Sequence, residues 1–250
     1  MSRSYVLASA TALGAAYTTL QVLGRRAGSS MHERAARLPG DELVHDPQMV
    51  MNHGVTIQTP PAEIWPWLTQ MGWHLGGYYT SHWVDKLIFP GNWESLARLD
   101  PHLVRDLRVG DVIPDGQPGT AYFRVARVEA PNLLVLKSHT HLPPGWGEKY
   151  GARITWTWTF HLTELPDAST RIHLRVRGRL SPWWLTALYV ATIVPADFVM
   201  ATGMLSGLKS RVEARATPQS SGREQLRPEL YLAGHERGHG RAPTIGARRT

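Results

Sequence analysis

The chain has 250 residues, of which 42% are hydrophobic and 19% are charged. These values are ordinary for a globular protein, so they favour neither wholesale disorder nor a membrane protein with many spans, and the length allows one folded domain with appendages. The absence of cysteine excludes a disulfide framework, thiolate zinc sites and a cysteine nucleophile. The formal net charge of +7 is not gathered into a compact basic patch with interleaved aromatics, so nucleic-acid binding is not expected.

The first notable segment is an uncharged stretch at residues 5–24, followed at once by Arg25 and Arg26. Its length suits a membrane anchor, but a secretory signal and a helix packed on the protein itself are also open interpretations. If the stretch spans a membrane, the two arginines favour a cytoplasmic body held at the inner face of the plasma membrane. Residues 1–30 are therefore interpreted as an N-terminal hydrophobic helix through which the protein associates with membrane if the first interpretation holds.

Residues 31–48 are charged and interrupted by proline and glycine, which is typical of a linker. The folded domain is expected over residues 49–214. Residues 215–250 are rich in Gly, Pro, Ser and Arg and predict a disordered basic tail.

The domain opens with an alternating strand pattern around Val55 and Ile57 that stops at Pro60. A helix is predicted directly afterwards, with Thr59 as its cap and Pro61 in its first turn. The apolar face of this helix consists of Ile64, Trp67, Leu68 and Met71.

Two longer alternating segments, residues 153–162 and 171–178, predict an antiparallel hairpin. Their inward-facing residues are Ile154, Trp156, Trp158, Phe160, Leu162, Ile172, Leu174 and Val176. The residues between them are mostly Thr, His and Arg, which predicts one face turned toward water. Residues 121–138 read as two further strands that turn at residues 130–132.

A long helix over residues 182–214 is predicted to cover the dry face of this sheet. It carries an apolar stripe of Phe198, Ala201, Leu205, Leu208 and Val212. Its first half is apolar all round and is either deeply buried or membrane-facing, and Pro195 is expected to kink it.

Two histidine patterns suggest a metal site, but the residues around each pattern do not support one. His235, Glu236 and His239 spell the zinc-protease pattern HExxH, but the surrounding glycines oppose the helix that this pattern needs. His139 and His141 share one strand face, yet two imidazoles do not complete a zinc site. No metal and no cofactor are therefore expected.

The order of these elements and four particular stretches resemble the SRPBCC or START-like superfamily, which includes polyketide cyclases and lipid-transfer proteins. The stretches are TIQTPPAEIWPWLTQMG, GGYYTSHWVDKL, LRVGDVIPDG and FVMATGMLSGLKSR. The chain is most similar to members of actinobacterial type, although it has Leu75 where many of those carry arginine. The resemblance implies an α+β helix-grip fold, in which a curved antiparallel sheet wraps around a long C-terminal helix.

The resemblance also implies a cavity between sheet and helix for a hydrophobic small molecule. From the residue pattern, the expected ligand-binding residues are Trp73, Tyr78, Tyr79, Trp83, Trp156, Trp158, Phe160, Phe198, Ala201 and Leu205. The alternative is that the three aromatics on one strand fill this space and leave only a packed core.

Two functions follow from this reading. The first is binding of a lipid, isoprenoid or polyketide. The second is a cyclase or dehydratase that uses His53, Tyr78 or Asp85 as a general acid or base, with His139 as a further available group. A weaker third possibility is an interaction module with a filled core. The sequence does not identify the ligand or the oligomeric state.

Overall fold

The computed structural model describes residues 3–216, so the predicted tail and its HExxH pattern lie outside the described residues. The helical elements are α1 (Arg3–Arg26), α2 (Met31–Ala35), the 3-10 turn η1 (Asp41–Leu43), α3 (Pro61–Thr69), α4 (His82–Ile88), α5 (Trp146–Tyr150) and α6 (Trp183–Ala216). The strands are β1 (Met49–Ile57), β2 (Val112–Pro114), β3 (Tyr122–Glu129), β4 (Leu133–Ser138), β5 (Arg153–Glu164) and β6 (Thr170–Ser181).

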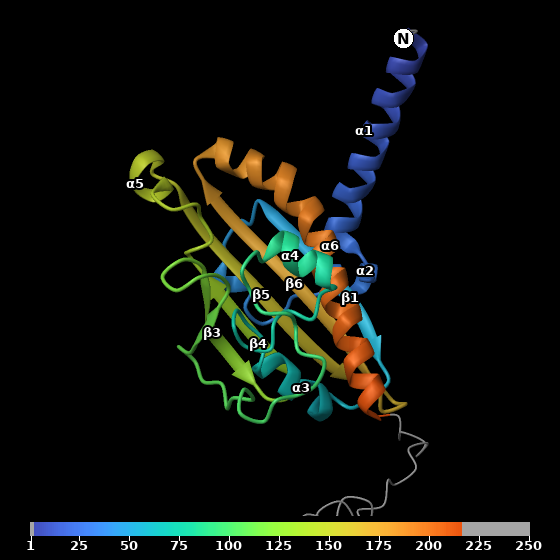
Figure 1. Ribbon diagram of the computed structural model, residues 1–250, viewed down its shortest axis with the longest axis vertical. Coiled ribbons are helices and arrows are strands. Elements are labelled where there is room, and N and C mark those ends of the chain that lie inside the picture. Colours follow the sequence, from blue (N-terminus) through green and yellow to red (C-terminus); the bar gives the residue numbers. More distant parts are fainter. Residues whose placement is uncertain (1–2, 217–250) are drawn as a thin grey trace, which may run out of the picture. The chain divides into compact units, whose positions relative to one another are not determined.

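The six strands form one antiparallel sheet in the order β1-β6-β5-β4-β3-β2, and α6 crosses one face of it (Figure 1). The predicted hairpin is confirmed as β5 and β6, paired from Arg153 opposite Ser181 to Glu164 opposite Thr170. Strand β1 pairs with the other edge of β6, although the two are far apart in the sequence. The protein therefore has the predicted α+β class and helix-grip arrangement.

The inner face of the sheet forms the core, as the alternation of residues predicted. All eight predicted inward residues of β5 and β6 are buried, together with Ala201, Leu205, Leu208 and Val212 of α6. Helix α3 buries its predicted face on the same core and begins with Pro61. The predicted cap was wrong, because the hydroxyl of Thr59 donates to the carbonyl of Gln58 and Pro60 occupies the N-cap position.

The outer face of the sheet is covered at its centre, so the prediction that it faces water was wrong there. Thr157, Thr159, His173 and Arg175 are all buried although they point away from the core. The segment from residue 27 to 48, which includes the predicted linker, lies across them and buries its own apolar side chains. The side chains buried in this way are Leu38 and Val44.

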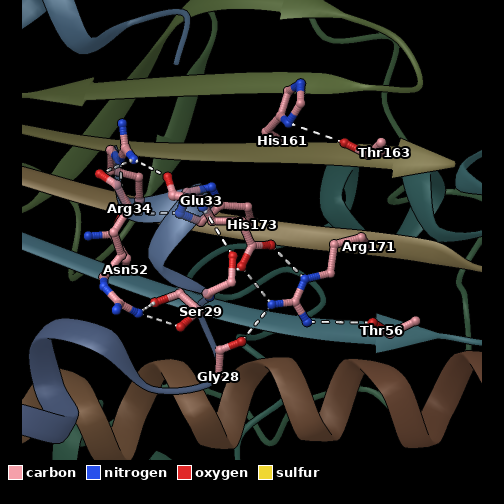
Figure 2. Close-up of polar contacts among 12 residues, drawn as sticks. Gly28, Ser29, Glu33, Arg34, Asn52, Thr56, His161, Thr163, Arg171 and His173 are labelled. Carbon is pink, nitrogen blue, oxygen red and sulfur yellow. Dashed lines mark hydrogen bonds and ion pairs between the residues drawn. The ribbon is translucent and has the colours of Figure 1, made fainter. Parts of the chain in front are cut away.

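The covering segment is held by a polar cluster around Glu33, shown in Figure 2. Its carboxylate accepts two hydrogen bonds from Arg171, at 2.7 and 2.9 Å, and a third from the backbone N–H of Ser30. The Arg171 guanidinium lowers the pKa of Glu33 to about 2. Arg171 also donates to the carbonyl of Gly28, so one side chain of β6 fixes both the start of α2 and the turn before it.

Arg175 extends this cluster beneath the segment. It is 3% exposed and donates to the carboxylate of Asp41 at 2.7 Å, to the amide oxygen of Asn52 at 2.9 Å, and to the carbonyls of Glu33 and Ala36. A buried guanidinium is tolerated only when its donors are satisfied, which is the case here. Folding of the covering segment and burial of Arg175 therefore depend on each other.

Helix α1 is attached to α6 through two backbone carbonyls just before Pro195, one of which the proline leaves without a helical donor. Proline has no N–H, so the carbonyl of Ala191, four residues earlier, has no helical donor. The hydroxyl of Tyr17 donates to that carbonyl at 2.9 Å, and the side-chain amide of Gln21 donates to the carbonyl of Val190 at 2.8 Å. The predicted kink is visible in Figure 1 as a change in the direction of α6.

The two helices come closest at Gly24, where a Cβ atom would lie 2.2 Å from the carbonyl oxygen of Val194. Toward its N-terminus α1 extends away from the sheet (Figure 1) and leaves apolar side chains in the open, with Tyr5 73% and Leu13 72% exposed. Among the described helices, α6 is the one whose length and apolar composition are compatible with a membrane span, and its second half is the core helix.

Candidate functional site

A pocket of about 380 Å³ lies between the first half of α6, the inner face of β3 to β5 and the loops that follow β2 and β4. Its apolar lining consists of Ile88, Phe89, Ala121, Phe123, Leu142, Pro143, Trp156, Trp158, Tyr189, Ile193, Ala196 and Met200, and its polar lining of Asp115, Thr120, Thr140, His141 and Asp197. The predicted cavity between sheet and helix is therefore present.

Aromatic rings form the wall on the side of the sheet. Trp156 and Trp158 project from the inner face of β5, as the alternation of that strand requires. Phe123 of β3 packs against Trp158 with 5.0 Å between ring centroids, and Phe160 meets Trp158 edge to face from behind. These contacts hold the indole of Trp158 in place, so the aromatics line the space instead of filling it.

Helix α6 supplies the opposite wall, with Ile193, Asp197 and Met200 near the bend at Pro195. Tyr189 closes one end of this wall. Its hydroxyl donates to the carbonyl of His141 at 2.8 Å, and burial raises the pKa of this hydroxyl. The hydrogen bond links the helix to the loop after β4, so both walls are fixed relative to each other.

The first polar feature of the lining is the pair of His141 and Asp115, which come from the ends of β4 and β2. The imidazole Nε2 lies 2.6 Å from Oδ2 of Asp115, and Nδ1 lies 2.7 Å from the hydroxyl of Ser138. When the ring is neutral, donation by Nε2 to the carboxylate leaves Nδ1 to accept from Ser138, which sets the tautomer. Burial, with the nearby carboxylate of Asp115 as the second cause, raises the pKa of the Tyr78 hydroxyl well above its usual value.

The second polar feature is the pair of His53 and Asp197, which connects β1 to α6. The imidazole Nε2 lies 2.6 Å from Oδ2 of Asp197, and the two side chains are 0% and 4% exposed. Nδ1 of His53 is buried and makes no hydrogen bond within residues 3–216. Asp197 lines the pocket and His53 lies behind it, so the carboxylate is the part of this pair that a bound molecule would meet.

The structure brings only part of the predicted ligand-binding set to the pocket. Trp156 and Trp158 line it. Tyr78, Phe160, Ala201 and Leu205 are buried in the core around it, Trp73 and Tyr79 are buried but do not line it, Phe198 is half-buried outside it, and Trp83 is 60% exposed outside it.

The predicted acid–base groups do not converge. His53 is bonded to Asp197, while the Tyr78 hydroxyl donates to the carbonyl of Pro114 at 3.0 Å. Asp85 is buried elsewhere, where it accepts hydrogen bonds from the hydroxyls of Thr80 and Ser95 and from a backbone N–H.

The remaining candidate, His139, contacts the carbonyl of Ile154 through Nδ1 at 3.0 Å and does not line the pocket. Among residues 3–216, no three side chains of His, Asp or Glu are grouped as a metal site would require.

Sequence reasoning missed Asp115 and Asp197 and considered His141 only as a metal ligand. Asp197 carried a usable signal, because it is a charged residue within the apolar first two thirds of a long helix. Asp115 carried none, since it stands in a sequence, IPDGQPG, that reads as an ordinary turn.

No family model and no curated protein sequence matches the chain. Among solved structures it is similar to a point mutant of a Thalictrum norcoclaurine synthase in complex with a transition-state analogue, at 13% identity over 68% of this chain and 96% of that chain, with a TM-score of 0.40. It is also similar to a hypothetical protein from Helicobacter pylori, at 14% identity over 70% of this chain and 95% of that chain, with a TM-score of 0.42. An HSP90 activator from Plasmodium falciparum aligns at 16% identity over 52% of this chain and 72% of that chain, with a TM-score of 0.31. At such identities and scores, none of them transfers an activity, a ligand or a partner to this chain.

Proposed function

We propose that this protein binds a hydrophobic or amphipathic small molecule, such as a lipid, an isoprenoid or a polyketide, in the pocket between its sheet and α6. The proposal agrees with the sequence resemblance to the SRPBCC or START-like superfamily. The observation that carries it is the pocket itself, which has mostly apolar walls and a few polar groups. Its volume of about 380 Å³ lies within the range of small-molecule sites, roughly 300–1,000 Å³.

Binding is favoured over catalysis by the three groups expected from the sequence, because of where these groups lie. An enzyme of the cyclase type needs its acid and base beside the reacting atoms. Asp85 has its hydrogen bonds satisfied outside the pocket, and His53 reaches the pocket only through Asp197. The aromatic wall, in contrast, is directly available to a ligand.

Pocket occupancy is testable with a matched pair of substitutions on α6. Ala196 and Ala187 are both exposed residues of this helix, and of the two only Ala196 lines the pocket. Ala196→Phe places a ring in the pocket, and we expect it to reduce co-purified ligand by about tenfold, because overpacking costs about 1–3 kcal/mol. Ala187→Phe is the control and should leave the ligand unchanged. The measurement is mass spectrometry of organic extracts of the full-length protein beside a mock purification.

The opposite result is a blank extract from the wild-type protein together with no thermal shift across a panel of lipids and polyketides. That outcome would contradict the proposal and favour a core that closes around no ligand.

We further propose that α1 attaches the protein to the inner face of a membrane. Two observations support this. The stretch at residues 5–24 has no charged residue, and Tyr5 and residues 9–19 are exposed on a helix that extends away from the sheet. Leaving Leu13 72% exposed costs free energy in water and none in lipid. Arg25 and Arg26 follow the stretch and favour a position on the cytoplasmic side.

A further inference from the structure

The polar part of the pocket lining is acidic. It contains the carboxylates of Asp115 and Asp197, and it contains no lysine or arginine. Each carboxylate has a single imidazole as its ion-pair partner, His141 and His53 respectively. Among the described residues, neither carboxylate forms an ion pair with lysine or arginine. The two carboxylates are therefore the acidic side chains of an otherwise mostly apolar lining, and histidine is the only basic side chain beside them among the described residues.

The carboxylate of Asp115 is not fully used within the protein. Its side chain is 9% exposed, and its Oδ2 is engaged by His141. Its Oδ1 is buried and accepts no hydrogen bond from the described residues. A buried carboxylate oxygen without a donor costs free energy, which a bound cation would offset through its positive charge, and an N–H-bearing amine also through a donated hydrogen bond.

The aromatic rings that line the pocket together with these carboxylates suit a positive charge. Trp156, Trp158, Phe123 and Tyr189 all line the pocket, and the faces of such rings attract cations. Tryptophan is the most favourable ring for this contact. A neutral ligand would satisfy the aromatic wall but would offer the two carboxylates no partner beyond their histidines.

We infer that the ligand of this pocket is an organic cation, an amine or quaternary ammonium group carried on an apolar body. This inference rests on the proposed binding function and names the chemical class of its ligand. The apolar body packs on the sheet wall and Met200, and the cationic group lies among the rings between Asp115 and Asp197.

The test compares two probes of the same shape. Phenyltrimethylammonium and tert-butylbenzene differ only by a cationic nitrogen in place of a carbon. Binding to the full-length protein is measured by ligand-observed NMR titration. We expect the cation to bind about five- to thirtyfold more tightly, since a cation–π contact with a desolvated partner contributes roughly 1–2 kcal/mol.

Substitutions then assign the preference to the two carboxylates. Asp115→Asn and Asp197→Asn keep the side-chain shape and remove one charge each, so each should weaken the cation by about fivefold or more while tert-butylbenzene stays within about twofold. Asp106→Asn removes the same charge at a site that is 88% exposed and should change neither probe. If Asp197→Asn fails to fold, Asp115→Asn decides the question, because its carboxylate is bonded only to a partly exposed histidine.

Two other outcomes separate the inference from the function on which it rests. If tert-butylbenzene binds as tightly as the cation and the Asn variants change nothing, the inference of a cationic ligand is overturned, while the proposed binding of an apolar molecule is retained. If neither probe binds and Ala196→Phe has no effect on extracted ligand, both the cationic ligand and the proposed binding function are overturned.

Discussion

Asp197 is a residue of the pocket that the sequence could have indicated, although the sequence could not indicate its partner. It is the only charged residue between positions 182 and 208, a signal that sequence reading could have used. Its partner was not readable, because His53 lies 144 positions away and the two meet only through the packing of α6 on β1. The inward direction of Trp156 and Trp158 was predicted correctly, because strand alternation alone determines it.

His173 carries a residue-scale prediction about pH. Burial, with the neighbouring Arg175 as a second cause, lowers the pKa of His173 to about 4 from its ordinary 6.5. The unfolded chain therefore takes up a proton below about pH 6.5 that the folded protein takes up only near pH 4. The free energy of unfolding should fall across this window, by at most about 3 kcal/mol. Glu33 acts in the next window, since its stabilising effect is lost as the pH falls from 4.5 to about 2.

The measurement is urea unfolding at steps from pH 7 to pH 4. His173→Gln can still donate to Asn52 and should flatten the slope between pH 6.5 and 4.5. His102→Gln, at an exposed position, is the matched control and should retain the slope. An unchanged slope in His173→Gln would show that another group causes the acid sensitivity.

At the scale of elements, the strands and the main helices could be predicted, while the covering of the sheet could not. Residues 153–162 and 171–178 alternate strictly, which determines both their strand structure and their inner face. The outer face was wrongly predicted to face water because Thr, His and Arg are polar. Polar side chains can also be buried when backbone carbonyls satisfy their hydrogen bonds, as they do for Arg175. Nothing local in residues 31–48 indicates that their carbonyls serve Arg175.

The crossing of α1 and α6 gives an element-scale prediction. Gly24→Ala places a methyl group 2.2 Å from the carbonyl oxygen of Val194 and should separate the two helices. Gly14→Ala meets no atom within 4 Å and should stabilise α1 by about 0.5–1 kcal/mol through helix propensity. Hydrogen exchange of α1 checks both, with faster exchange expected in Gly24→Ala and slower exchange in Gly14→Ala. Equal protection in the two variants would mean that α1 does not depend on this contact.

At the scale of the whole molecule, the proposed membrane association would attach the entire protein through α1. Leu13→Glu introduces a charge into the uncharged stretch at an exposed position, where it does not disturb the fold. We expect the full-length wild-type protein to float with liposomes and Leu13→Glu to remain in the soluble fraction, because a charge in the hydrocarbon costs about 3 kcal/mol. Val109→Glu, at a site that is 68% exposed on the folded body, is the control and should still float. Flotation of Leu13→Glu would place the membrane contact elsewhere on the protein.

The pairing of β1 with β6 also has a consequence for the order of events during synthesis. β1 ends at Ile57, yet its partner strand is complete only when the ribosome has added Ser181. Until then β1 lacks its partner strand, Glu33 lacks Arg171, and α1 lacks the α6 carbonyls to which it binds. The newly made chain therefore exposes its uncharged N-terminal helix for most of translation, and that helix can meet a membrane or a chaperone before it can meet its own domain.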